Sequence, residues 1–390
     1  MTVVETKPTT QLLAVQHAAR LFRVGGVVGL EEAGGVLEAA AVEAVLELEG
    51  PALLDLLPRR SLLVLTGERL RSLGAEAAAE AAYTLPLAAA AHVPGGLAML
   101  ADPTAPAPAA PALQALLAEA VRSEQPAALA VIELCKLAGL LPAAILAPAG
   151  VPIQALSERA SVAAAWVSGY RRQSAATLRP VSEARVPLAD AEQVRIVSFR
   201  PADGGPEQYA ILVGEPEREA APLARLHSEC FTGDLLGSLR CDCGDQLRGA
   251  IRRMVHEGAG VLLYLAQEGR GIGLPNKLRA YTLQDGGLDT VDANHHLGFA
   301  NDERDFWAAA AMLRQLGIDR VRLLTNNPAK IAQLSAYGIE VAGRVPHIFE
   351  ANAHNRGYLL TKARRSGHLL AAEDIEPGAP RPQGCRLTLV

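Results

Sequence analysis

Short apolar runs and stretches with helical periodicity follow one another in the second half of the chain, from about residue 193 onward. Short apolar runs predict strands at 194–199, 209–213, 261–266 and 321–325. Helical periodicity predicts helices at 245–256, 276–283 and 302–316, and another that begins at Pro328, where proline suits a first turn. This alternation predicts an α/β domain whose strand ends carry the polar motifs.

The first half of the chain, up to about residue 190, is dominated by Ala and Leu and has few polar motifs. A low-complexity stretch, DPTAPAPAAP, occupies 102–111. The most apolar stretch, 127–153, is interrupted by Glu133, Lys136 and Pro142. These interruptions favour a buried helix and a loop over a membrane span.

Length and the change in pattern predict more than one domain. A chain of 390 residues can form two or three domains, each with a core of its own. The segment 179–193, RPVSEARVPLADAEQ, predicts a linker. We therefore expect two domains, at 1–190 and 191–370, followed by a flexible tail at 371–390.

Charge and cysteine content narrow the function classes. The formal net charge is -5 and the pI is about 6.0, so we expect neither a nucleic-acid partner nor a membrane partner. The start, MTVVETKPTT, lacks the apolar segment of a secretory signal. Three of the five cysteines cluster at 230–243, which argues against a disulfide framework and favours a reducing cytoplasm. The other two, Cys135 and Cys385, are expected to be inert.

The strongest candidate for chemistry is the stretch 227–246, HSECFTGDLLGSLRCDCGDQ. Zinc binds thiolates readily, and structural zinc sites usually have four protein ligands. Cys230, Cys241 and Cys243 offer three, which would leave one coordination position for water, as in catalytic sites. Two alternatives stay open: His227 completes a structural site, or the three cysteines are reduced core residues.

Two further motifs place glycines or polar residues between a strand and a helix. In QEGRGIGLPNK, 267–277, glycines let backbone amides approach a phosphate, and Arg270 and Lys277 supply positive charge. This loop lacks the ending of a P-loop, so an ordinary strand-to-helix turn is an equal alternative. The stretch 323–330, LLTNNPAK, has a geometry that binds phosphate or merely caps its helix.

The stretch 298–306, GFANDERDF, marks the start of a predicted helix. Asp302 fits an N-cap, and Glu303 and Asp305 would then be favourable first-turn charges. Arg304 fits this interpretation badly, because a cation is unfavourable at a helix N-terminus, and it fits better beside an anion. Several anion-binding motifs together with one zinc motif indicate a polyphosphorylated substrate.

Six motifs in order, RLHSEC, RCDCG, QEGRGIGL, NKLRAY, DERDF and LLTNNPAK, resemble GTP cyclohydrolase II. The resemblance runs from about residue 194 to 370 and ends in YLLTKARRSGHLL. It implies an α/β domain with a mixed sheet. It also implies the first step of riboflavin biosynthesis, in which GTP is hydrolysed to a diaminopyrimidinone ribosyl phosphate, formate and diphosphate. It also implies that Cys230, Cys241 and Cys243 bind one catalytic zinc, and that Mg²⁺ accompanies the GTP triphosphate. We also expect a homodimer.

The resemblance assigns roles to further matching positions. Asp302 matches the proposed proton acceptor, Arg304 the proposed nucleophile and Tyr281 an active-site tyrosine. The positions that match GTP contacts are Arg225, Leu226, His227, Ser228, Glu229, Gln246, Glu268, Gly269, Arg270, Thr290, Thr325 and Lys330.

Physical chemistry supports most of these roles but not a nucleophilic Arg304. A guanidinium stays protonated at neutral pH, so we expect Arg304 to be a charge clamp on the α-phosphate. Tyr281 is suited to donate a hydrogen bond to the carbonyl that forms on ring opening. Magnesium would neutralise the triphosphate and assist the departure of diphosphate.

The first half is similar to dihydroxybutanone phosphate synthase in its length, its position and the string VIELCKLAGLLPAAIL at 131–146. That enzyme needs an acidic loop for a divalent metal and a histidine before the matching helix. This chain offers only Glu31 and Glu32 in the loop, and Ala127 stands at the histidine position. We therefore expect a degenerate domain without catalysis, whose role is structural or in dimerisation.

Two other functions can be distinguished from the opening of the guanine ring of GTP. A homologue that stops at the formamide product, or acts on another purine nucleotide, would not be expected to keep both Tyr281 and Gln246. A GTP-sensing module with a structural zinc would not need Asp302, Arg304 and Tyr281 together. Release of formate from GTP decides between these functions and ring opening.

Overall fold

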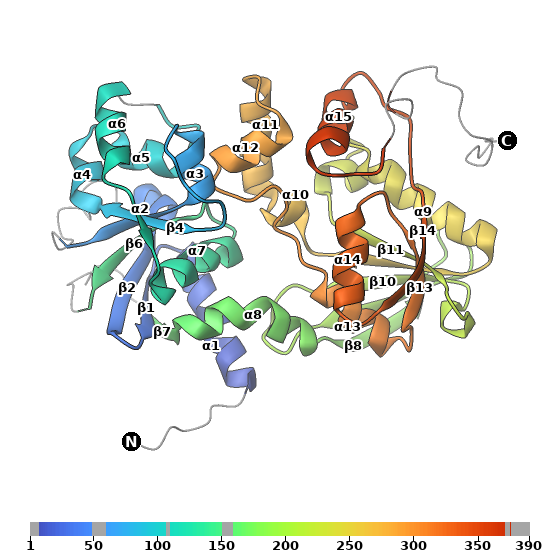
Figure 1. Ribbon diagram of the computed structural model, residues 1–390. Coiled ribbons are helices and arrows are strands. Elements are labelled where there is room, and N and C mark those ends of the chain that lie inside the picture. The colour runs from blue at the N-terminus through green and yellow to red at the C-terminus, as the bar shows by residue number, and fades with distance from the viewer. Residues whose placement is uncertain (1–7, 49–59, 107–109, 150–158, 371–374, 376–390) are drawn as a thin grey trace. The chain divides into compact units, whose positions relative to one another are not determined.

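Among the residues that the structure describes, two seven-stranded sheets form, one in each of two compact units (Figure 1). The structure is a computed structural model and describes residues 8–48, 60–106, 110–149, 159–370 and 375. The first unit contains Met1–Thr177, Pro201–Gly205 and Gly269–Arg304. The second unit contains Leu178–Arg200, Pro206–Glu268 and Asp305–Val390.

The sheet of the first unit has the strand order β5-β4-β3-β6-β2-β1-β7. Its strands are β1 (Val27–Glu32), β2 (Gly35–Ala41), β3 (Leu62–Thr66), β4 (Ala82–Pro86), β5 (Val121–Ser123), β6 (Ala143–Pro148) and β7 (Arg159–Ala163). β1 and β7 pair in parallel, and the other neighbours pair antiparallel, so the sheet is mixed.

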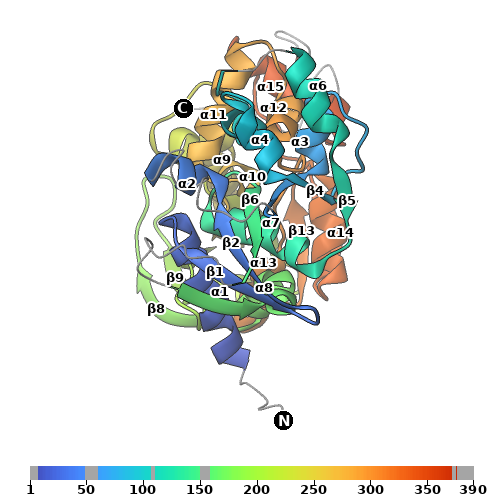
Figure 2. The same ribbon diagram turned by 90° about the vertical axis from the view of Figure 1, so that its left-hand side faces the viewer.

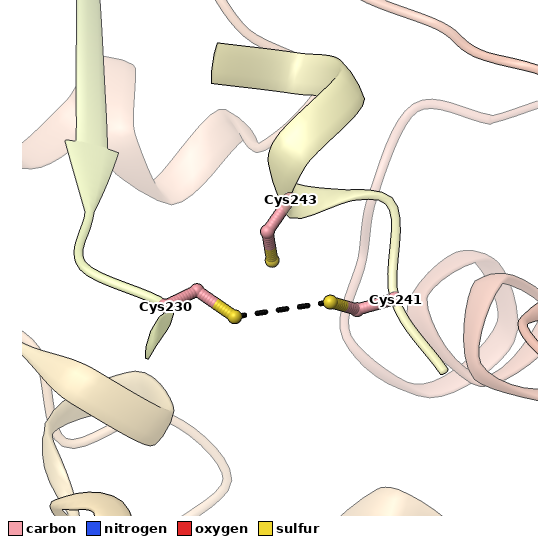
Figure 3. A group of neighbouring side chains, drawn as sticks. All are labelled: Cys230, Cys241 and Cys243. Carbon is pink, nitrogen blue, oxygen red and sulfur yellow. Dashed lines mark hydrogen bonds between the residues drawn. The ribbon is translucent and has the colours of Figure 1, made fainter. Parts of the chain in front are cut away.

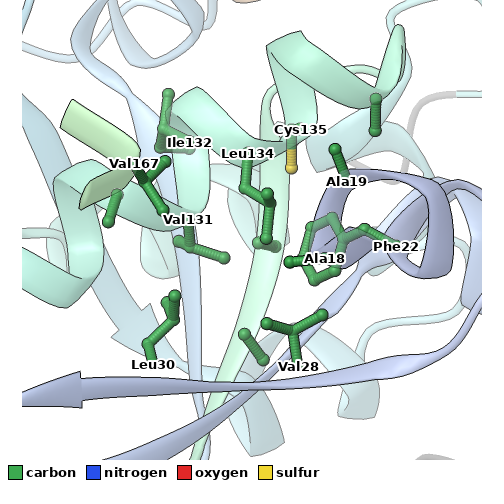
Figure 4. Packing of buried hydrophobic residues seen from close by; sticks show 14 of the residues in the cluster. Ala18, Ala19, Phe22, Val28, Leu30, Val131, Ile132, Leu134, Cys135 and Val167 are labelled. Atoms are coloured by element: carbon green, nitrogen blue, oxygen red, sulfur yellow. The ribbon is translucent and has the colours of Figure 1, made fainter. Parts of the chain in front are cut away.

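Helices cover both faces of this sheet. Val64 of β3 belongs to one apolar cluster, while Leu63 and Leu65 belong to another, because successive side chains of a strand point to opposite faces. The first cluster, drawn in part in Figure 4, includes residues of α1 (Pro8–Arg23), α7 (Pro126–Ala138) and α8 (Ala164–Ala176). The second includes residues of α2 (Val42–Leu48), α3 (Gly67–Ser72), α4 (Leu87–His92), α5 (Gly96–Ala101) and α6 (Ala110–Ala118). Burial on both faces explains why the first half shows apolar runs without alternation.

In the apolar stretch 127–153, the described residues up to 149 include most of α7 and all of β6, which confirms the buried helix expected there; residues 150–153 lie outside the described part of the chain. Cys135 of α7 lies in the first cluster and is fully buried, and burial raises the pKa of its thiol well above the ordinary value. A protonated thiol without solvent access is unreactive, as expected for Cys135. No helix in the described part of the chain is long and apolar enough to cross a membrane.

The segment 269–304 packs in the first unit, although it lies far along the chain. It contains α11 (Leu274–Asp285) and α12 (Thr290–His296), preceded by the short α10 (Glu268–Gly271). α12 lies beside α3, as both views of the ribbon show (Figures 1 and 2). The hydrophobic core of this part consists of Leu141, Ile272, Ala280, Ala293, Leu297 and Phe299.

The sheet of the second unit has the order β14-β13-β11-β12-β10-β9-β8. Its strands are β8 (Arg179–Arg185), β9 (Val194–Arg200), β10 (Gln208–Val213), β11 (Leu223–Ser228), β12 (Gly260–Leu265), β13 (Arg320–Leu324) and β14 (Glu340–Val345). β14, β13, β11 and β12 are parallel, and β12, β10, β9 and β8 pair antiparallel. The expected α/β domain with a mixed sheet is therefore confirmed.

The helices of the second unit divide between the two faces of its sheet (Figure 1). α9 (Cys243–Glu257) packs on one face, and α13 (Trp307–Gln315) and α14 (Pro328–Ala336) pack on the other. The last helix is α15 (Arg356–Arg365). The strands expected at 194–199, 209–213, 261–266 and 321–325 are confirmed as β9, β10, β12 and β13. The helices expected at 245–256, at 276–283 and from Pro328 are confirmed as α9, α11 and α14.

The expected linker at 179–193 is wrong in its first half, which forms β8 at the edge of the second sheet. All seven side chains of β8 are exposed, so no alternation of apolar and polar positions marks it as a strand. Its pairing with β9 draws the chain into the second unit from Leu178 onward. The change of unit consequently comes before the expected boundary near residue 190.

The helix expected at 302–316 is also wrong at its start, because α13 begins at Trp307. Asp302 is not an N-cap, since its carboxylate accepts hydrogen bonds from the backbone and guanidinium of Arg304. Asp305 lies closer to the helix and accepts the N–H of Trp307 at 3.2 Å. The tail expected at 371–390, including Cys385, lies outside the described residues except for the buried Ile375.

Candidate functional site

Three cysteine thiols meet in the second unit (Figure 3). Cys230 lies two residues after β11, Cys241 lies in the turn before α9, and Cys243 is the first residue of α9. Their sulfur atoms all lie within 4.8 Å of one another, and the Sγ atoms of Cys230 and Cys241 are 3.8 Å apart. In the described part of the chain, no other three His, Cys, Asp or Glu side chains gather in this way.

The surroundings of the thiols fit a soft divalent metal. A Cβ atom at Gly233 would lie 2.8 Å from Cys241 Sγ and 3.0 Å from Cys230 Sγ, so only glycine fits against the sulfur atoms here. Hydrogen bonding with Cys230 raises the pKa of Cys241 to about 11, and Cys230 and Cys241 raise that of Cys243. Three crowded thiols resist ionisation unless a cation is present. Zinc is such a cation, and three thiolates are a known donor type for it.

His227 does not complete this group. Its ring is 2% exposed, and Nε2 lies 3.1 and 3.2 Å from the carboxylate oxygens of Asp234. Burial lowers the pKa of His227, which outweighs the opposite effect of Asp234 and favours the neutral ring. The alternative of a structural site with His227 as fourth ligand is therefore not supported by the geometry of the described residues.

Asp234 organises the turn that carries the first cysteine. Its Oδ2 accepts the backbone N–H of Cys230 at 3.0 Å and the hydroxyl of Tyr264 at 3.0 Å, in addition to the contact with His227. The Tyr264 ring stacks on His227 with centroids 5.7 Å apart. Asp234 thus links β11 and β12 to the Cys230 turn.

Lys362 of α15 supports the other two cysteines through Asp242, which lies between them in sequence. Lys362 Nζ lies 2.9 Å from Asp242 Oδ1, and the side chains are 10% and 6% exposed. Burial alone would raise the pKa of Asp242, but the charge of Lys362 outweighs it and the net pKa is lowered. Asp242 also accepts a hydrogen bond from Gln246, whose own oxygen accepts one from Arg225.

The end of β13 leads into α14 through a capped turn. Asn327 is the N-cap and accepts the N–H of Ala329 at 2.9 Å, while Thr325 Oγ1 accepts the N–H of Asn327 at 3.0 Å. The buried Lys330 donates to the carbonyl of Leu226 at 2.7 Å. This turn therefore caps its helix, and a buried cation lies in its first turn.

Arg270, Asp302 and Arg304 come together in the first unit. Arg270 has a left-handed backbone with φ of 61°, and its Nη1 donates to Asn301 Oδ1 at 2.9 Å. Arg304 forms a bidentate pair with Asp302, with distances of 2.7 and 2.6 Å. Burial would raise the pKa of Asp302, but Arg304 and then Arg270 lower it below the ordinary value. Strained backbone of this kind often marks a functional site.

The remaining predicted residues lie on several elements. In the second unit, the side chain of Leu226 lies in the core. Ser228 is the last residue of β11, and Glu229 follows Ser228. Glu268 Oε2 accepts the N–H of Phe231 at 2.6 Å. In the first unit, Gly269 precedes Arg270, Tyr281 lies in α11, and Thr290 begins α12. Lys277 Nζ is 6.0 Å from the centre of the Tyr281 ring.

Comparison with known proteins identifies the family. The model of the GTP cyclohydrolase II family matches residues 179–346. A protein of Azospirillum brasilense named GTP cyclohydrolase-2 is 50% identical over 376 residues, which are 91% of this chain and 94% of the relative. This chain belongs to the GTP cyclohydrolase II family. Its activity is accordingly the hydrolytic opening of GTP in riboflavin biosynthesis.

Shorter relatives of the family match about half of this chain. GTP cyclohydrolase-2 of Citrobacter koseri is 52% identical over 193 residues, which are 50% of this chain and 98% of the relative. That of Salmonella typhimurium is 51% identical over 194 residues, with the same coverage. A two-domain 3,4-dihydroxy-2-butanone 4-phosphate synthase from A. baumannii aligns with 85% of this chain and 99% of its own, at 16% identity and a TM-score of 0.30. That similarity is too low to indicate shared activity.

Two residues that support the cysteine group of this GTP cyclohydrolase II family member were missed by the sequence interpretation. Asp234 lies inside the cysteine motif, and its position four residues after Cys230 is a local signal that an acid could bond that turn. Lys362 follows Asp242 by 120 residues and lies beyond the end of the family match at residue 346. Nothing local in the sequence connects Lys362 to the cysteines.

We predict that Lys362→Met weakens metal retention. Without the ammonium, Asp242 stays buried without its cation, and the turn between Cys241 and Cys243 loses its support. Outer-shell changes typically cost about 10- to 100-fold in metal affinity. Zinc per chain after dialysis against a graded series of chelator concentrations measures the effect. Arg364→Met, on the exposed side of the same helix, is the matched control, and equal zinc retention in both variants would contradict the role of Lys362.

Proposed function

We propose that zinc held by Cys230, Cys241 and Cys243 carries the ring opening of GTP. The observation that supports this most directly is that the three sulfur atoms lie within 4.8 Å of one another. They lie against Gly233, where any side chain would clash with the sulfur atoms. When bound, zinc would supply an activated water for attack on C8 of the guanine ring. With three thiolates as ligands, the fourth position is available for that water.

The residues of the chain that we propose as catalytic are Asp302, Arg304 and Tyr281. Asp302 is a carboxylate paired with Arg304, and a carboxylate is able to accept a proton. Arg304 is a guanidinium paired with that carboxylate, which favours a charge clamp on the α-phosphate over a nucleophile. Tyr281 would donate a hydrogen bond to the carbonyl formed on ring opening.

We propose that GTP contacts come from residues matching those of the family. Mg²⁺ bound to the triphosphate would neutralise its charge and assist the loss of diphosphate. A homodimer and a cytoplasmic location stay predictions. The proposed contacts are Arg225, Leu226 through its backbone, His227, Ser228, Glu229, Gln246, Glu268, Gly269, Arg270, Thr290, Thr325 and Lys330.

The first test concerns the metal. Cys241→Ser is expected to remove both bound zinc, about one per chain in the parent, and formate release from GTP. Cys135→Ala, a change at a buried thiol outside the group, is expected to keep both. Metal analysis and a formate assay on the same samples measure the two effects. Full activity in a zinc-free Cys241→Ser protein would refute a zinc-dependent mechanism.

The second test separates ring chemistry from phosphate chemistry. If zinc serves only the ring, Cys243→Ser is expected to release diphosphate from GTP while forming no formate. Arg304→Ala is expected to lose both products, because the α-phosphate loses its clamp. Mass spectrometry of the products from GTP and magnesium shows each outcome. Diphosphate release at the parent rate by Arg304→Ala would show that Arg304 does not act on the phosphate.

The third test concerns the first half of the chain, which we propose to have no dihydroxybutanone phosphate synthase activity. Its two candidate acids are engaged elsewhere: Glu32 Oε2 accepts the N–H of Ala127 at 3.0 Å, and Glu31 Oε1 accepts the hydroxyl of Ser161 at 2.6 Å. A shifted alignment of the first half would offer His92 in place of the histidine that is missing at Ala127, and His92 is exposed at the end of α4.

A missing acid–base group typically costs about 100- to 10,000-fold in rate. With the metal-binding acids also engaged, we expect no detectable turnover of ribulose 5-phosphate in the presence of magnesium. The assay measures dihydroxybutanone phosphate and formate, with GTP turnover by the same preparation as the positive control. Accumulation of both products from ribulose 5-phosphate would show that the chain is bifunctional.

A further inference from the structure

Lys136 of α7 holds the stretch that carries Asp302 and Arg304. Its Nζ lies 2.8 and 2.9 Å from the two carboxylate oxygens of Glu303, and the side chains of the pair are 16% and 11% exposed. Glu303 also accepts the N–H of Ala300 at 2.7 Å. Lys136, a residue of the first half, therefore holds the Glu303 carboxylate, which in turn bonds the backbone of Ala300 within the stretch 300–304.

Glu303 connects this stretch to the Arg270 loop. Its backbone N–H donates to the carbonyl of Arg270 at 3.1 Å, where the Arg270 backbone is left-handed. Gly271 approaches so closely that a Cβ there would lie 3.1 Å from the carbonyl carbon of Glu303. A displacement of Glu303 would consequently shift the backbone of Arg270 as well.

Glu43 of α2 holds α11 near Tyr281. Glu43 Oε1 lies 2.7 Å from Nη2 of Arg279, which precedes Tyr281 by two residues. The other oxygen of Glu43 accepts the N–H of Leu141 at 2.7 Å, and Arg279 also donates to Asn276 Oδ1 at 2.8 Å. The carboxylate thus joins α11 to the loop between α7 and β6.

The C-terminal end of α12 is fixed by two side chains of the first half. Thr66 Oγ1 donates to the carbonyl of Gly298 at 2.8 Å, and Arg69 Nη1 donates to the carbonyl of His296 at 2.9 Å. Gly298 has a φ of 84°, and a Cβ there would lie 2.9 Å from Pro142. Side chains from four parts of the first half therefore hold residues 269–304 at several points.

We propose that the first half of the chain is a scaffold for the segment 269–304, with Lys136 and Glu43 as positioning residues for the opening of GTP. This inference rests on the proposed function of Arg270, Tyr281 and the Asp302 stretch. It gives the first half a role in the reaction without a reaction of its own.

The chemistry of the contacts favours positioning over general stability. Burying an ion pair costs desolvation, so such a pair adds little stability compared with apolar side chains of the same size. It does require one geometry, because removal of one partner leaves a buried charge without its counterpart. The apolar cluster around Leu141 packs against the segment without directional bonds, whereas the pairs made by Lys136 and Glu43 require one geometry.

The test uses the full-length zinc-loaded protein and the variant Lys136→Met. Hydrogen exchange measured by mass spectrometry is expected to rise in peptides from 269–304 and to stay unchanged at 227–246. The kcat for formate release is expected to fall by about 10- to 100-fold, since a misplacement of about 1 Å can cost about 100-fold. Zinc per chain is expected to stay constant.

Two matched variants separate positioning from folding. Lys136→Arg keeps the charge and is expected to restore most of kcat, whereas Arg171→Met breaks the pair with Glu133 in the same unit and is expected to change neither exchange at 269–304 nor kcat. Glu43→Gln keeps an oxygen for Leu141 but loses the charge that faces Arg279. Asp102, whose Oδ2 lies 3.4 Å from Arg279 Nε, remains as a second carboxylate beside this arginine. Glu43→Gln is still expected to raise exchange in α11, because it weakens the closer of the two pairs, and this keeps the test valid if Lys136→Met fails to fold.

The outcomes are decisive in both directions. Unchanged exchange at 269–304 in Lys136→Met and Glu43→Gln overturns the scaffold, and raised exchange with an unchanged kcat overturns the positioning role. If the parent protein releases no formate from GTP, the proposed function is rejected. Raised exchange at 269–304 in both variants would still support the scaffold in that case.

Discussion

Parallel strand ends are the constraint on which the second unit depends. β13, β11 and β12 are neighbours and run in the same direction, so the residues that follow them emerge at one edge of the sheet. The cysteine turn follows β11, Glu268 follows β12, and the Thr325 turn follows β13. Lys330, which follows β13, consequently reaches the carbonyl of Leu226 in β11 at 2.7 Å, although the two residues are 104 positions apart in the sequence.

The cysteine group is the second constraint, because three crowded thiols, of which Cys241 and Cys243 have raised pKa values, must be held in contact. Contacts from outside the group hold the turns that carry them. Asp234 holds the turn of Cys230, and the buried pair of Asp242 with Lys362 holds the turn of the other two. Contacts of this kind, made from outside a group of side chains, fix the orientation of its members.

Acidic side chains of the first half make structural contacts within the first unit. Glu32 accepts the N–H of Ala127 at the start of α7, and Glu43 accepts the N–H of Leu141 and pairs with Arg279 of α11. The relatives of about half this length match over 98% of their own sequence, so half of this chain has no counterpart in them. The segment 269–304 of this chain lies in the same compact unit as residues 1–177 and contacts them, for example through Lys136 and Glu303.

The sequence by itself determined the alternation of strands and helices after residue 193, the three cysteines and the family, because these are local patterns or motifs in a fixed order. It did not determine that β8 is a strand, since an exposed edge strand has no apolar periodicity. Asp302 fitted an N-cap by its sequence position, but a bidentate arginine two residues away competes for the same carboxylate. The support from Lys362 and Lys136, and the membership of 269–304 in the first unit, were decided only by tertiary structure. A contact between residues 120 or 167 positions apart leaves no periodicity, because only the folded chain brings the two side chains together.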